Sequence, residues 1–126
     1  MKKHVLFGLM AGVALMAGVS SASAQDAAAG EKVFNACKAC HTLEAGKNRV
    51  GPSLHGLIGR PAGSVEGFAY SPAMKNAGVT WTDENLAKYL ADPKGFVAGN
   101  KMAFAGVKKE DDLKNLIAFL KQETAK

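Results

Sequence analysis

The sequence is poor in the residue types that usually build metal sites and cross-links in small proteins. Its 126 residues include only two cysteines and three histidines, and aromatic residues make up 7%. A structural zinc site needs four ligands, and no second paired motif is present to complete one. The chain also contains no internal repeat and no low-complexity tail. With 48% hydrophobic and 21% charged residues it is not intrinsically disordered, and its length predicts one ordinary domain.

Long hydrophobic runs are also missing, except at the N-terminus. Lys2 and Lys3 precede an uncharged apolar run over residues 5–19, and Ala22-Ser23-Ala24 fits a small-residue cleavage site. These fifteen residues fall short of the roughly 20 that a spanning helix needs, so a retained membrane anchor is the weaker interpretation. We therefore predict a signal peptide over residues 1–24, cleaved after Ala24, and export to a bacterial periplasm. Because both lysines leave with it, the remaining 102 residues carry a formal charge of +3.

The two cysteines lie in the segment Cys37-Lys38-Ala39-Cys40-His41. In an exported protein a lone pair would by default form a disulfide, but this spacing is the attachment signature of a c-type haem. At the end of a helix the two sulfurs share one face, so both can form thioethers to one haem, and His41 can reach the iron. A thioredoxin-like pair, a zinc site and a vicinal disulfide are the alternatives. The first would need a βαβ context that is not visible around residues 30–45.

Hydrophobic spacing predicts an all-α domain with a helix at each end. The clearest helix covers roughly residues 109–125, where leucine and isoleucine recur every three to four positions and acidic residues fill the first turn. A first helix is expected to follow Asp26 as N-cap and to run through Phe34 into the cysteine motif. Gly30 is either merely tolerated there or marks the close approach of another backbone. The second interpretation predicts that the two helices cross at Gly30.

The middle of the mature chain predicts shorter helices and a long loop. A short helix is expected over residues 71–78 with Ser71 as N-cap, and another is expected to follow Thr82 as N-cap and to end before Pro93. The stretch from residue 46 to 67 is rich in glycine and proline and is expected to be loop. Such a chain has a thin core of its own, so a buried haem would be structural as well as functional.

The sixth iron ligand separates an electron carrier from a catalyst. The possibilities are Met102, Met74, His55, a lysine or no ligand at all. Met102 lies in a glycine-bounded loop far in sequence from His41, so it can approach from the opposite face of the ring. Met74 falls in a predicted helical turn, where methionine is more often core filler, and His55 is expected at the surface. Met102 is therefore favoured, and a thioether with an imidazole would fill the coordination sphere.

Taken together, these residues resemble the small class I cytochromes c, which include bacterial cytochrome c2 and mitochondrial cytochrome c. The similarity extends from Ala29 to about Gln122. Its landmarks are Gly30 and Phe34, the motif over residues 37–41, residues 51–60, residues 67–70, Trp81, Tyr89 and Leu90, residues 101–106, and residues 116–120. The resemblance implies an all-α cytochrome c fold, with about three main helices, short helical turns and loops wrapped around one covalently bound haem.

The resemblance also implies roles for individual residues around that haem. These are Pro52 as acceptor for the second ring nitrogen of His41; Arg60, Tyr70 and Trp81 as partners of the haem propionates; Tyr89 and Asn100 near the Met102 sulfur; and Phe104 beside the haem edge. Two positions depart from the mitochondrial pattern. Asn48 replaces a common histidine, which removes the expected basis for a hydrogen bond between loops, and Met74 replaces a polar asparagine.

Saturated coordination by His41 and Met102 predicts a one-electron carrier and not an enzyme. Its expected partners are a quinol-oxidising membrane complex and an oxidase, reductase or photosynthetic reaction centre. Docking on their acidic faces is expected to use a ring of lysines: Lys38, Lys94, Lys101, Lys108 and Lys109. We expect a monomer that does not bind nucleic acid. The alternative function is a haem enzyme or gas-binding module with a labile sixth ligand and peroxidase-like activity.

Overall fold

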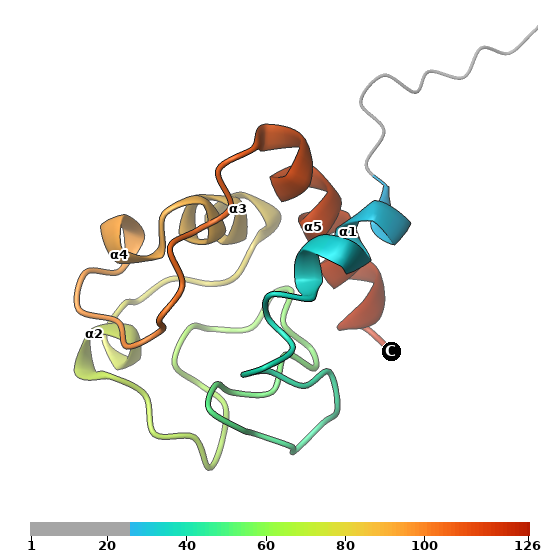
Figure 1. Cartoon of the computed structure of the whole chain (residues 1–126). Coiled ribbons are helices and arrows are strands. Elements are labelled where there is room, and N and C mark those ends of the chain that lie inside the picture. The colour runs from blue at the N-terminus through green and yellow to red at the C-terminus, as the bar shows by residue number, and fades with distance from the viewer. Residues whose placement is uncertain (1–25) are drawn as a thin grey trace, which may run out of the picture.

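The computed structural model describes residues 26–126, so the predicted signal peptide and its cleavage site lie outside the described residues. In this range five helices follow one another, and the one β-type contact is an isolated bridge between Pro61 and Thr80. The helices are α1 (Ala27–Phe34), α2 (Pro72–Lys75), α3 (Asp83–Ala91), α4 (Pro93–Phe96) and α5 (Glu110–Glu123). Figure 1 shows them around long loops, which confirms the predicted all-α class.

Three of the helices begin at a residue whose side chain caps the first turn by a hydrogen bond. The side chains of Asp26, Ser71 and Thr82 each accept a hydrogen bond from the backbone N–H three residues later, as the sequence predicts. The N-cap of α5, Lys109, makes no side-chain cap bond. Three acidic residues in the first turn of α5 instead compensate the positive end of the helix dipole.

Two helix boundaries differ from the sequence prediction. The first helix ends at Phe34, and residues 35–40 continue as turns and not as an α-helix. The sequence does not predict helix α4, because a proline after a helical segment indicates only where that segment ends. Proline needs no N–H at the first position of a helix, and Asp92 caps the new turn by accepting from Gly95 N at 3.1 Å.

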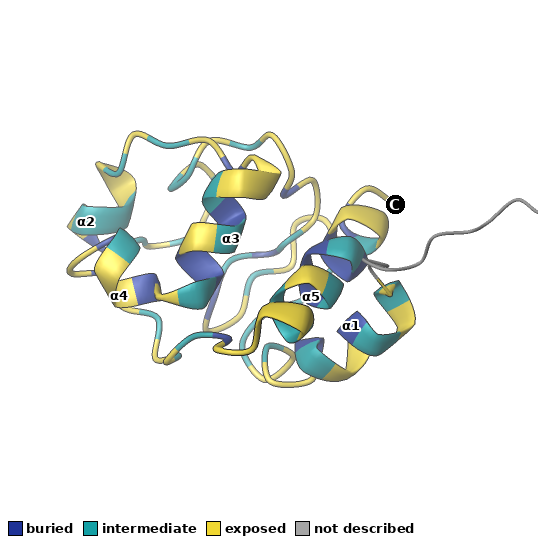
Figure 2. Cartoon of the chain, turned by 90° about the horizontal axis from the view of Figure 1, so that it is seen from above, coloured by how far each residue is buried: buried dark blue, intermediate teal, exposed yellow. Residues whose placement is uncertain are grey.

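The two terminal helices cross tightly, and this crossing forms one half of the core. Gly30 is buried, and a Cβ there would collide with the backbone carbonyl of Asn115 in α5. The rings of Phe34 and Phe119 pack with centroids 5.0 Å apart. Figures 1 and 2 both show α1 lying against α5, and the burial colours of Figure 2 mark buried positions on both helices. The interpretation of Gly30 as a close-approach position is therefore confirmed.

The other half of the core lies under α3. Leu86, Tyr89 and Leu90 are buried on its inner face, and Trp81 packs on Tyr89 with ring centroids 4.9 Å apart. The loop between α1 and α2 covers the opposite side of the molecule (Figure 1). No helix among the described residues is both long and apolar enough to cross a bilayer.

Candidate functional site

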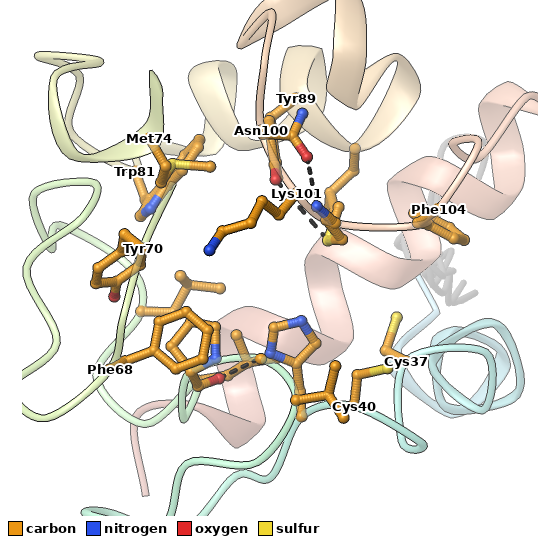
Figure 3. A pocket seen from close by; sticks show the side chains of 18 of the residues that line it. Cys37, Cys40, Phe68, Tyr70, Met74, Trp81, Tyr89, Asn100, Lys101 and Phe104 are labelled. Atoms are coloured by element: carbon orange, nitrogen blue, oxygen red, sulfur yellow. Dashed lines mark hydrogen bonds between the residues drawn. The ribbon is translucent and has the colours of Figure 1, made fainter. Parts of the chain in front are cut away.

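A cavity of about 470 Å³ opens between the loops, α3 and α5 (Figure 3). This volume falls within the range of small-molecule and cofactor sites, about 300–1,000 Å³. Every residue that the sequence assigned to the haem environment or to the iron lines this cavity: Cys37, Cys40, His41, Pro52, Arg60, Tyr70, Trp81, Tyr89, Asn100, Met102 and Phe104. Segments distant in sequence therefore converge on one site.

His41 is held in one tautomer by the loop that follows it. Its Nδ1 lies 2.7 Å from the carbonyl oxygen of Pro52, at the position that the resemblance implies. Because a carbonyl can only accept, Nδ1 carries the proton and Nε2 keeps its lone pair. Burial lowers the pKa of His41, so the ring is neutral at pH 7. A Cβ at Gly51 would collide with the ring, which explains the glycine before Pro52.

The two cysteines lie on one tight turn and form no disulfide with each other. Cys40 N and His41 N both donate to the carbonyl of Cys37, at 3.1 and 3.0 Å. Figure 3 shows both side chains at the same end of the cavity. Burial, with a contribution from Cys40, raises the pKa of Cys37 to about 11, so this thiol is protonated at neutral pH.

The Met102 side chain is contacted by a buried tyrosine. The Tyr89 hydroxyl donates to the Met102 sulfur at 3.8 Å (Figure 3). Burial raises the pKa of Tyr89 to about 12, so the hydroxyl keeps its proton. Asn100 lines the same cavity as Met102, and its side chain hydrogen-bonds backbone atoms. Its amide donates to the carbonyls of Pro93 and Val97, both at 2.9 Å, and its oxygen accepts from Met102 N at 2.8 Å.

The predicted propionate partners also line the cavity and are tied to loop backbone. Arg60 Nη1 donates to the carbonyls of Ser53 at 3.0 Å and His55 at 2.9 Å. The Tyr70 hydroxyl accepts from Val65 N at 3.0 Å. In Figure 3, Tyr70 and Trp81 lie across the cavity from the two cysteines.

The rival ligands occupy different environments. His55 is exposed and lies outside the cavity lining. Met74 is half-buried and does line the cavity, from α2, close to Trp81 in Figure 3. The sequence predicts Met74 as core filler, and the resemblance implies that it replaces a polar group near the haem; its position in this wall agrees with both. Lys101 likewise lines the cavity, although the sequence suggested only a docking role for it.

Asn48 makes the hydrogen bond between loops that the sequence comparison with the mitochondrial pattern did not lead us to expect. The departure from histidine suggested that a hydrogen bond between loops would be missing. Instead the Asn48 side chain accepts from Ser53 N at 2.8 Å and donates to the Glu66 carbonyl at 3.3 Å. A carboxamide has both a donor and an acceptor, so it bridges two loops as well as an imidazole can.

The residues present fit a covalently bound haem. Soft and neutral donors, an imidazole and a thioether, line one largely apolar cavity, and two thiols stand at its end. This donor set suits haem iron. Among residues 26–126, no group of three or more His, Cys, Asp or Glu side chains is arranged to hold a bare metal ion.

Comparison with known proteins agrees with this chemistry. The family model described as Cytochrome c matches residues 27–124. Cytochrome c2 of Blastochloris viridis is 52% identical over 124 residues, covering 98% of this chain and 95% of the relative. Cytochrome c-550 of Nitrobacter winogradskyi is 54% identical over 98 residues, covering 77% and 90%. The structure of cytochrome cH from Methylobacterium extorquens superposes with a TM-score of 0.71 at 48% identity, covering 76% of this chain and 97% of that one.

The Cys-x-x-Cys-His turn, the cavity above it and the match over almost the whole described chain agree with one another. The chain belongs to the cytochrome c family, whose members are electron carriers, not enzymes, with a covalently attached haem c.

Proposed function

We propose that this cytochrome is a periplasmic one-electron carrier whose haem iron has His41 and Met102 as axial ligands. The observation that carries the proposal is their placement around one cavity. His41 presents a free Nε2 because Pro52 binds its Nδ1, and Met102 reaches the cavity from a separate loop, where Tyr89 contacts its sulfur. Cys37 and Cys40 would form the thioethers.

Bound haem c supplies an iron that cycles between Fe(III) and Fe(II). His41 and Met102 would both hold this iron, which would leave no site for a substrate and would restrict the chemistry to electron transfer. The apolar lining excludes water from the ligands, and the Tyr89 hydroxyl withdraws electron density from the Met102 sulfur.

Export to the periplasm is supported by the N-terminal sequence and by one relative. The alignment with cytochrome c2 of Blastochloris viridis includes 124 of the 126 residues, so it extends through most of the predicted signal peptide over residues 1–24. In that compartment we propose a monomeric carrier between a quinol-oxidising membrane complex and an oxidase, reductase or reaction centre.

The ligand assignment is tested by replacing each cavity methionine in turn. Met102→Ala is expected to abolish the weak sulfur-to-iron charge-transfer absorption of the oxidised protein and to permit carbon monoxide binding by the reduced protein. The matched control, Met74→Leu, removes the other cavity thioether and should keep both wild-type properties. Loss of the absorption in Met74→Leu but not in Met102→Ala would contradict the assignment. Rapid carbon monoxide binding by the wild type would favour a gas-binding or peroxidase-like function instead.

A further inference from the structure

Two of the five lysines expected at the docking surface are hydrogen-bonded to the chain itself. Lys94 Nζ donates to the carbonyl oxygens of Asn100 at 3.1 Å and of Met102 at 3.0 Å. Lys108 Nζ donates to the carbonyl of Ala91 at 3.0 Å. The other three make no side-chain hydrogen bond or ion pair within residues 26–126: Lys38, Lys101 and Lys109.

The two carbonyls that Lys94 binds have no other donor among the described residues. They belong to the segment over residues 100–108, which forms no helix or strand and so lacks a regular hydrogen-bond ladder. Backbone carbonyls without such a ladder must be satisfied by side chains or water. One ammonium group that binds two of them fixes the backbone on both sides of residue 101.

Lys94 lies in a short helix that is anchored in the core. It belongs to α4, and its neighbours Pro93 and Val97 are buried in the core. Asn100 ties the same loop to α4 from inside, through its bonds to the carbonyls of Pro93 and Val97. The Met102 backbone is therefore held twice, by Asn100 at its N–H and by Lys94 at its carbonyl.

The far end of the loop is fastened to α3. Val107 N donates to the Leu90 carbonyl at 2.8 Å, next to the Lys108 bond to Ala91. These are the last carbonyls of α3, which lack partners inside the helix and carry the negative end of its dipole. A lysine ammonium is well suited to that position.

We propose that Lys94 is a positioning residue for the Met102 sulfur, with Lys108 as a second anchor of the same loop. This inference rests on the proposed function, because it takes Met102 as the iron ligand. By holding the Met102 carbonyl, Lys94 keeps the loop closed over the cavity. Removal of its ammonium group lets the loop open more often, without any change at the sulfur itself.

The test uses the oxidised holoprotein and imidazole as an exogenous ligand that must displace Met102. At about pH 8 free imidazole is neutral, so a changed surface charge does not steer it. Lys94→Met keeps the aliphatic stem and removes the donors. We expect the limiting rate of imidazole binding to rise roughly threefold to tenfold, the effect of losing one or two hydrogen bonds. Lys94→Arg restores charge and donors and should return most of this change, and Lys108→Met should raise the rate less than Lys94→Met.

The matched control is Lys109→Met, which removes the same charge from a lysine without an internal hydrogen bond. Its rate should stay within about twofold of the wild type. Equal rates in Lys94→Met and Lys109→Met would overturn the positioning role and leave Lys94 as an ordinary surface charge. If the wild-type protein lacks the sulfur-to-iron absorption, the ligand proposal fails instead, so the two failures are distinguishable.

Discussion

The carbonyl of Pro52 controls which nitrogen of His41 is free to bind. A single hydrogen bond of 2.7 Å selects the tautomer, and burial keeps the ring neutral. The Tyr89 hydroxyl donates a hydrogen bond to the Met102 sulfur. The Asn48 carboxamide joins two loops, by accepting from Ser53 N and donating to the Glu66 carbonyl. At the scale of single residues, the cavity walls depend on a few side chains that each hydrogen-bond a backbone or side-chain atom of the wall.

Asn48→Ala tests this dependence for the loops around the cavity. The change removes both hydrogen bonds and leaves Ser53 N without its acceptor. We expect the free energy of unfolding to fall by about 1–2 kcal/mol, measured by guanidinium unfolding of the holoprotein. The control is Asn35→Ala, because Asn35 is exposed and its side chain makes no hydrogen bond within residues 26–126. Equal stability of the two variants would show that the bridge contributes nothing.

At the scale of elements, the crossing of α1 and α5 is fixed by a missing side chain. Helices pack this closely only where backbone meets backbone, and Gly30 is the position in α1 that faces the carbonyl of Asn115. Phe34 and Phe119 then fill the space beside the contact. The exposed ion pair between Lys121 and Asp83, at 2.8 Å, also joins α5 to α3, but such surface pairs contribute about 0–1 kcal/mol.

Gly30→Ala should therefore destabilise the protein, although alanine is the better helix former. The new methyl group forces α1 and α5 apart, and overpacking of this kind costs typically about 1–3 kcal/mol. The denaturation midpoint of the holoprotein should fall accordingly, whereas Glu31→Ala, at the adjacent exposed position, should change it little. An unchanged or increased midpoint in Gly30→Ala would mean that the crossing can relax without cost.

At the scale of the whole molecule, the cavity of about 470 Å³ lies between the two halves of the core. Its walls are largely apolar, so without a bound group they would face water, which opposes close packing of the two halves. The core residues of α3 and α5 thus need a bound group between them.

The double variant Cys37→Ser with Cys40→Ser removes both attachment points and tests this dependence. We expect the protein purified without haem to lack a cooperative unfolding transition and to lose near-ultraviolet circular dichroism, because its two core halves no longer share a filled interior. Holoprotein measured in parallel should unfold cooperatively. A cooperative transition in the haem-free variant would show that the polypeptide core is sufficient by itself.

The sequence alone was enough for features that depend on local chemistry. The caps at Asp26, Ser71 and Thr82 and the periodic face of α5 follow from short-range hydrogen bonding and spacing. The close approach at Gly30 was one of two interpretations that the sequence left open, and the structure decided between them. Helix α4 was missed because Pro93 can end one helix and begin another, and only the Asp92 cap decides between these outcomes.

What the tertiary structure alone decided concerns partners distant in sequence. Whether Asn48 could replace a histidine depended on the position of Glu66, and the role of Asn100 depended on the carbonyls of α4. Lys94 appeared in the sequence as one charge among several, and only the fold places within its reach two carbonyls that no other donor of residues 26–126 binds. The sequence determines which donors, acceptors and ligand atoms the chain carries, because these belong to single residues and short motifs. The tertiary structure determines which of them pair, because a hydrogen bond requires two atoms to be close in space.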